Sequence, residues 1–232
     1  MRDQKIVATI GGISGIILSV AQLAGIILHG SIPVDPVDAL GFIYNHSSWS
    51  LTHIILIFSY FTVVGFYLGL KTTFSYLYPM VQIGGYLIFV GAFLGALHFT
   101  IHFSIFKYSA QAYQEASQTA NKEVIATFYH MSHHYAHLLN RLSLFIMMIV
   151  EFIFSFYMLR DGQFKKWIAI LGLVASALML ATIPIIELVL PRPTGDLVFA
   201  GMILPTIVWI FLTALAILRR KPGVGKIAVM LQ

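Results

Sequence analysis

The run LLNRLSLFIMMIVEFIFSFYML, residues 138–159, decides the fold class of this chain. It has the length that an α-helix needs to cross the hydrocarbon core of a bilayer, which is about 20 residues. Only two of its side chains carry a charge, Arg141 and Glu151. The run therefore predicts a transmembrane helix.

Five further runs have the same length and apolar character. The helix that contains the first run is expected to begin outside the bilayer, because no proline or glycine separates Glu123 from Gly162. The sequence predicts an all-α integral membrane protein, a single six-transmembrane-helix bundle over residues 1–232. Its helices are expected at about 6–28, 51–70, 81–103, 125–159, 167–190 and 197–218.

The composition agrees with this class and limits the chemistry. Hydrophobic residues make up 59% of the chain and charged residues 10%, and the mean hydropathy is +0.87, so the expected location is a cell membrane, crossed several times. The net charge of +5 arises from basic residues that flank apolar runs, so the expected partner is the lipid bilayer and not nucleic acid. Cysteine is absent, which excludes thiolate metal sites and iron–sulfur clusters and leaves imidazole, carboxylate or backbone oxygen as ligands.

Basic residues also predict the orientation of the chain. Cytoplasmic loops of membrane proteins carry an excess of Lys and Arg, and here the loops on the side of both termini are the basic ones. They hold Arg2, Lys5, Lys71, Arg160, Lys165, Lys166, Arg219, Arg220, Lys221 and Lys226. Both termini are therefore expected in the cytoplasm. The extracytoplasmic face then receives the polar stretch from Ser104 to about Phe128 and all nine histidines.

Six of these histidines form two groups with helical spacing. His98 and His102 lie one turn apart on one helix face, a spacing that suits two ligands of one metal ion. The other four, His130, His133, His134 and His137, fall within about 60° of a common direction on the fourth helix. Arg141 and Glu151 continue that stripe. Because ionisable groups at membrane depth usually face the bundle interior, we expect the two histidine faces to meet.

The candidate site follows from these positions. His53 opens the second helix at the same level, and Glu187 adds a carboxylate near the end of the fifth helix. The candidate metal ligands are His53, His98, His102, His130, His133, His134, His137 and Glu187. Of these, His133 and Glu187, together with Arg141, are also expected as neighbours of the ligands or as substrate contacts. His29 and His46 are interpreted as interfacial or hydrogen-bonded residues outside the site.

Three kinds of ligand fit such a cluster. The first is a transition metal, iron, copper or zinc, on neutral imidazoles. The second is haem b, with cofactor-binding residues drawn from His98 or His102 on one helix and His134 or His137 on another. The third is an ion pathway that Glu151 and Glu187 continue inward. The expected function is membrane redox chemistry, as an oxidoreductase, oxygenase or electron-transfer protein, and the alternative is a transition-metal transporter or sensor without redox turnover.

The substrate and the assembly state follow less directly. A lipophilic substrate, such as a quinone or an acyl chain, would reach the predicted site laterally from the bilayer. Glycines at the starts of several helices permit close helix approach, and association into a homo-oligomer is an open alternative.

Two resemblances add to these expectations. The boxes His98-x-x-x-His102 and His130-x-x-His133-His134 are similar to two histidine boxes of membrane di-iron desaturases and hydroxylases. That resemblance implies oxygen activation at a di-iron centre with those five histidines as ligands. A third box is missing downstream, and the boxes of that family face the cytoplasm, whereas the charge pattern here directs them outward.

The second resemblance is to uncharacterised bacterial six-helix membrane proteins, known only as a domain of unknown function. It rests on the turn between the fourth and fifth helices, where Tyr157-Met158-Leu159-Arg160 leads into Trp167-Ile168-Ala169-Ile170-Leu171-Gly172. The resemblance implies the number of helices and no particular activity.

Overall fold

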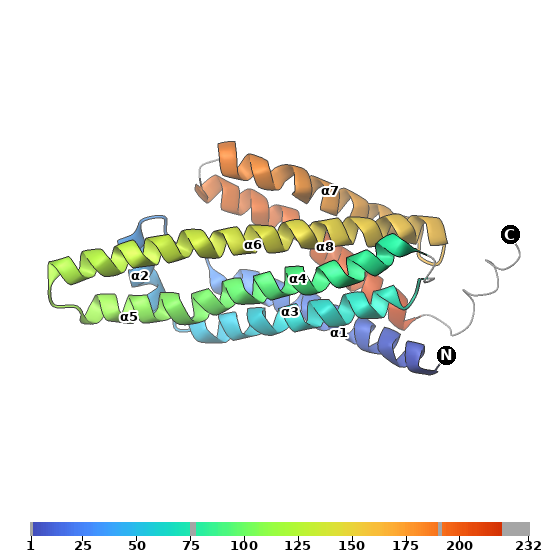
Figure 1. Cartoon of the computed structure of the whole chain (residues 1–232), viewed down its shortest axis with the longest axis horizontal. Coiled ribbons are helices and arrows are strands. Elements are labelled where there is room, and N and C mark those ends of the chain that lie inside the picture. The colour runs from blue at the N-terminus through green and yellow to red at the C-terminus, as the bar shows by residue number, and fades with distance from the viewer. Residues whose placement is uncertain (1, 75–77, 190–191, 220–232) are drawn as a thin grey trace, which may run out of the picture.

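The computed structural model describes residues 2–74, 78–189 and 192–219, and all regular structure in these ranges is helical. The long helices run side by side along the long axis of the molecule (Figure 1). In chain order they are α1 (Arg2–His29), α2 (Pro36–Asn45), α3 (Trp49–Lys71), α4 (Pro79–Ile101), the π-helical turn η1 (His102–Phe106), α5 (Lys107–Glu115), α6 (Thr119–Asp161), α7 (Lys166–Val189) and α8 (Arg192–Leu218).

Six helices of the described chain are long and apolar enough to cross a membrane. This confirms the prediction of an all-α chain with six candidate membrane spans. The first turn of α1 and the last turn of α8 lie at the same end of the bundle (Figure 1). We call the opposite end, where α1 ends and α3 begins, the histidine end.

The third and fourth long helices differ most from the sequence prediction. The third and fourth helices were expected at 81–103 and 125–159, with a polar stretch between them, but α4 continues through η1 and α5, and α6 begins at Thr119. Neither proline nor glycine occurs between Gly95 and Gly162, so nothing in this stretch stops a helix. With a rise of 1.5 Å per residue, α6 is about 65 Å long, twice the thickness of a bilayer core. The hairpin of α5 and α6 therefore extends the histidine end well beyond one membrane thickness.

A short helix that the apolar pattern did not predict, α2, packs against α5 and α6 at the histidine end. Asp35, the residue before α2, caps the helix: its side chain accepts hydrogen bonds from the backbone N–H groups of Val37 and Asp38, at 2.9 and 3.1 Å. Pro36 occupies the first turn, where its missing N–H has no helical partner to lose. The buried face of α2 belongs to a second core cluster, formed by Ala39, Leu40, Ile43, Trp49, Ile101, Phe106, Ala110, Tyr129, Ala136 and Leu139.

The buried histidines lie between this second core and the main core of the bundle. On α3, His53 follows Trp49 of the second core and precedes Tyr60 of the main core. The continuous helix α4–η1 has the same arrangement in the reverse chain order, because His98 and His102 follow main-core residues and precede Phe106 of the second core. Polar rings thus occupy a layer between two apolar regions.

Close contact between α1 and α3 sets the position of that layer. A Cβ atom added at Gly11 would meet the backbone of Gly69, and one added at Gly69 would meet the backbone of Gly11. Only small residues allow two helix backbones to approach in this way. At the histidine end, Gly30 has a φ of 66° and turns the chain away directly after α1. The last residue of α1 therefore lies beside the first turns of α3.

Candidate metal centre

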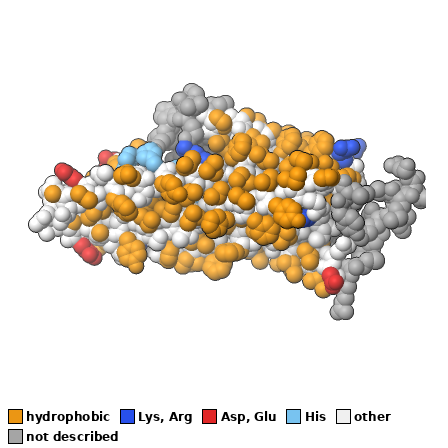
Figure 2. All heavy atoms as spheres, viewed as in Figure 1, with side chains coloured by type: hydrophobic (Ala, Val, Ile, Leu, Met, Phe, Trp, Pro, Cys, Tyr) orange, Lys and Arg blue, Asp and Glu red, His pale blue; other side chains and the backbone are white. Residues whose placement is uncertain are grey.

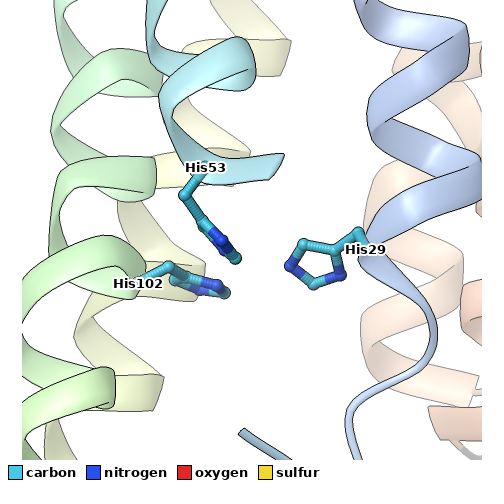
Figure 3. A group of neighbouring side chains, drawn as sticks. All are labelled: His29, His53 and His102. Carbon is cyan, nitrogen blue, oxygen red and sulfur yellow. The ribbon is translucent and has the colours of Figure 1, made fainter. Parts of the chain in front are cut away.

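Three imidazole rings converge at the histidine end from three different helices (Figure 3). His29 is the last residue of α1, His53 lies in the second turn of α3, and His102 opens η1. One ring nitrogen of each lies within 4.8 Å of the others. His53 and His102 are buried and His29 is half-buried. We call these residues the three-histidine group.

Backbone carbonyl groups fix the tautomer of two of these rings. The Nδ1 atom of His53 lies 2.7 Å from the Trp49 carbonyl oxygen, and Nδ1 of His29 lies 2.9 Å from that of Gly30. Because a carbonyl oxygen only accepts, each Nδ1 carries the proton and donates it. Each Nε2 then presents a lone pair, and neither Nε2 has a hydrogen-bond partner in the described chain. Metal-binding histidines are oriented in this way.

His102 is placed by the π-helical turn and by Trp49. The Trp49 indole N–H donates to the backbone carbonyl of His102 at 3.0 Å. The two rings are parallel, with an interplanar angle of 1° and centroids 6.1 Å apart. Neither ring nitrogen of His102 has a partner among the described residues. Single π turns within α-helices occur frequently at functional sites.

Unpaired ring nitrogens in this group are energetically costly. Each buried polar atom without a partner destabilises the folded state by about 1–3 kcal/mol, and such atoms call for an ion or ordered water. The group has four of them: Nε2 of His29, Nε2 of His53 and both ring nitrogens of His102. A metal ion would accept the lone pairs. Ligands of a tetrahedral ion with bonds of about 2.0–2.1 Å lie about 3.4 Å apart, so these nitrogens, now within 4.8 Å of one another, would move closer together to bind one ion.

His98 lies beside the group in the same tautomer. Its Nδ1 lies 2.9 Å from the carbonyl oxygen of Ala136 on α6, so Nδ1 donates and Nε2 carries the lone pair. Its ring centroid is 4.3 Å from that of His102. His98 therefore joins α4 to α6 and supplies a neighbouring imidazole outside the three-histidine group.

The four histidines of α6 separate into two pairs. His133 is buried, and its ring lies 6.4 Å from His102 and 4.5 Å from the half-buried His137. His130 and His134 are exposed. The expectation that all four face the bundle interior is wrong for this second pair. The buried face of α6 is centred near Tyr129, His133 and Ala136, and at 100° per residue the other two lie beyond its edge.

Glu151 does not join the three-histidine group. Glu151 is fully buried on α6, near Tyr67 and Thr206 in the main part of the bundle. The side chain of Glu187 lies outside the described residues. Arg141, on the stripe with Glu151, is half-buried.

The two histidines expected outside the site, His46 and His29, have different environments. The Nε2 atom of His46 lies 2.9 Å from the carbonyl oxygen of Leu28, so this ring donates to the end of α1, in agreement with the hydrogen-bonded role expected for it. His29, in contrast, lies within the three-histidine group. The sequence contains an indication for His29, because the predicted first helix ends beside it and the predicted second helix begins near His53. The sequence does not show that α1 and α3 are in contact, and only this contact brings the two histidines together.

No protein-family model, curated protein or solved structure matches this chain. The resemblances to di-iron enzymes and to the six-helix bacterial family therefore stay predictions. The assignment of function rests on the side chains.

Proposed function

We propose that this protein is an integral membrane metalloprotein that binds one transition-metal ion at the three-histidine group and uses it in redox chemistry. The observation that carries the proposal is the convergence of three imidazoles with unpartnered ring nitrogens. Among the described residues, Nε2 of His29, Nε2 of His53 and both ring nitrogens of His102 have no hydrogen-bond partner. The basic loops support a cytoplasmic location of both termini. The centre then lies toward the extracytoplasmic side.

The ligand set favours copper among the redox metals. Non-haem iron centres with open positions use two histidines and a carboxylate, and no carboxylate of the described chain belongs to the group. Imidazole suits copper and zinc, and three protein ligands leave one position for substrate or water. Copper supplies redox turnover. Zinc at the same ligands would supply only Lewis-acid or structural chemistry.

The surroundings of His102 favour a single ion over haem. Haem b needs two axial imidazoles with a wide planar ring between them. Seven aromatic rings of the described residues surround His102 with centroids 4.3–6.4 Å away, those of His29, Trp49, His53, His98, Phe99, Phe106 and His133. His134, one of the expected axial ligands, is exposed on α6. A small ion needs far less space among these rings.

A lipid-soluble electron carrier, such as a quinone, is the proposed substrate. His29 is the half-buried member of the group, and the residues before it, Ile27 and Leu28, expose apolar side chains. This edge of the site is therefore open toward an apolar environment. An extended aromatic or isoprenoid molecule fits such an edge better than a hydrophilic substrate does.

The second candidate function is a metal transporter or sensor without redox turnover. His133 and His137 favour it, because they lead from the buried His102 toward the half-buried side of α6. A row of imidazoles suits the stepwise movement of an ion. The metal bound at the centre would then be the ion that the protein transports or detects, and not a redox cofactor.

The metal content of untagged protein tests the proposal. After dialysis against a weak chelator, the wild-type protein is expected to retain one metal ion per chain, whereas His53→Ala and His102→Ala lose it. The matched control is His134→Ala, which removes an exposed histidine and retains the ion when every variant is loaded to equilibrium before dialysis. Copper with an electron paramagnetic resonance signal supports redox chemistry, and spectroscopically silent zinc supports the second candidate. A haem absorption band, or a metal-free protein after purification and reloading, would overturn the proposal.

A further inference from the structure

The two exposed histidines of α6 approach each other closely. His130 and His134 lie one helical turn apart, and their Nε2 atoms are 3.2 Å from each other. Their rings are nearly perpendicular, at 88°, with centroids 4.6 Å apart. Histidine side chains are visible on the surface of the molecule toward the histidine end (Figure 2). We call His130 and His134 the surface pair.

The separation of these nitrogens matches that of two ligands on one ion. With bonds of about 2.0–2.1 Å, adjacent ligand nitrogens lie about 3.4 Å apart on a tetrahedral ion and about 2.9 Å apart on a square-planar one. The observed 3.2 Å lies between these values. The two Nε2 atoms are hydrogen-bonded to each other, so one of them carries a proton. A metal ion would replace that proton once the ring carries its proton on Nδ1 instead, without a change of backbone. Water can complete the coordination because both rings are exposed.

We propose that the surface pair is a second metal site, which binds a divalent transition-metal ion such as Cu²⁺ or Zn²⁺ reversibly. Two protein ligands bind more weakly than three, and exposed coordination positions exchange water readily. The site is therefore suited to capture and release of an ion. It is separate from the three-histidine group, since His130 and His134 point away from the buried face of α6.

Its place on α6 gives this second site a role. His133 stands between the members of the surface pair in sequence, and its ring on the buried side is 6.4 Å from His102. At 100° per residue, His133 lies about 60° from His130 and about 100° from His134 around α6, so an ion held by the surface pair lies on the face next to the one that His133 presents to the buried centre. We assign the surface pair to supply ions to that centre. This role rests on the proposed function, whereas metal binding by the pair does not.

The test uses a chain in which the buried centre is removed. Full-length untagged protein with His53→Ala and His102→Ala is titrated with Cu²⁺ and followed by electron paramagnetic resonance. We expect one saturable site with nitrogen ligands, and its loss when either His130→Ala or His134→Ala is added. Met131→Ala is the matched control, since Met131 lies between the pair in sequence and is exposed. Circular dichroism checks that every variant keeps its helices.

A second variant separates a defined site from a general affinity of histidine for metals. His134→Ala combined with Tyr135→His keeps the number of histidines but breaks the one-turn spacing, and it is expected to abolish the saturable site. Unchanged Cu²⁺ binding in this variant, or in His130→Ala, would overturn the proposal. If the wild-type protein lacks a buried metal but the surface pair binds Cu²⁺ in this way, the proposed function fails and the surface site stands. Slower loading of the buried centre in His134→Ala is expected for the supply role, and an unchanged loading rate would contradict it.

Discussion

At the scale of single residues, the three-histidine group binds metal only while its imidazoles are neutral. Protons compete with the metal for the same lone pair. Metal affinity is therefore expected to fall as the pH is lowered. The measurement is the metal retained after dialysis at a series of pH values. Retention that rises toward acid pH would contradict imidazole ligation.

The indole N–H of Trp49 positions His102, because it donates a hydrogen bond to the backbone carbonyl of His102. Its removal is expected to change metal binding. Trp49→Phe removes the donor to the His102 carbonyl, and the loss of a group that orients a ligand is expected to weaken metal affinity about tenfold or more. Trp209→Phe is a matched control, because Trp209 is equally buried and its indole nitrogen has no partner in the described chain. Competition with a chelator of known affinity measures both. Equal losses in the two variants would show that packing alone accounts for the effect.

At the scale of helices, the contact between α1 and α3 determines whether the site forms. Gly69→Ala places a methyl group against the backbone of Gly11, and the helices must separate at a cost of about 1–3 kcal/mol. The expected result is a lower melting temperature in detergent. Gly41→Ala on α2 is the control, since nothing lies within 4 Å of the added atom, and alanine is the better helix former. Similar melting of both variants and the wild type would contradict this packing.

The helices also show which features of the fold and of the site could be predicted from the sequence and which could not. Apolar runs of membrane-spanning length predicted six helices, because that signal depends only on local composition. The one-turn spacing of His98 and His102 placed both on a buried face, as periodicity within one helix can. Periodicity did not predict which helix ends meet, so His29 was set aside. It also placed His130 and His134 on one inward-facing stripe with His133 and His137, whereas both side chains are exposed beyond the edge of the buried face of α6.

At the scale of the whole molecule, the orientation in the membrane is open to a direct test. The chain has no cysteine, so single cysteines can be introduced without a background. Ser117→Cys, between α5 and α6, is expected to react with a membrane-impermeant reagent from outside the cell. Gly162→Cys, between α6 and α7, is expected to react only after the membrane is opened. Labelling of both from the same side would contradict the orientation predicted from the basic loops.

The most direct test of the central claim is X-ray absorption at the edge of the metal bound to the wild-type protein. Three imidazoles at the histidine end predict a first shell dominated by nitrogen at about 2 Å, with the outer-shell scattering of imidazole rings for three ligands. His102→Ala should reduce that scattering or empty the site. A first shell of carboxylate oxygens, or the pattern of a porphyrin, would contradict the three-histidine centre.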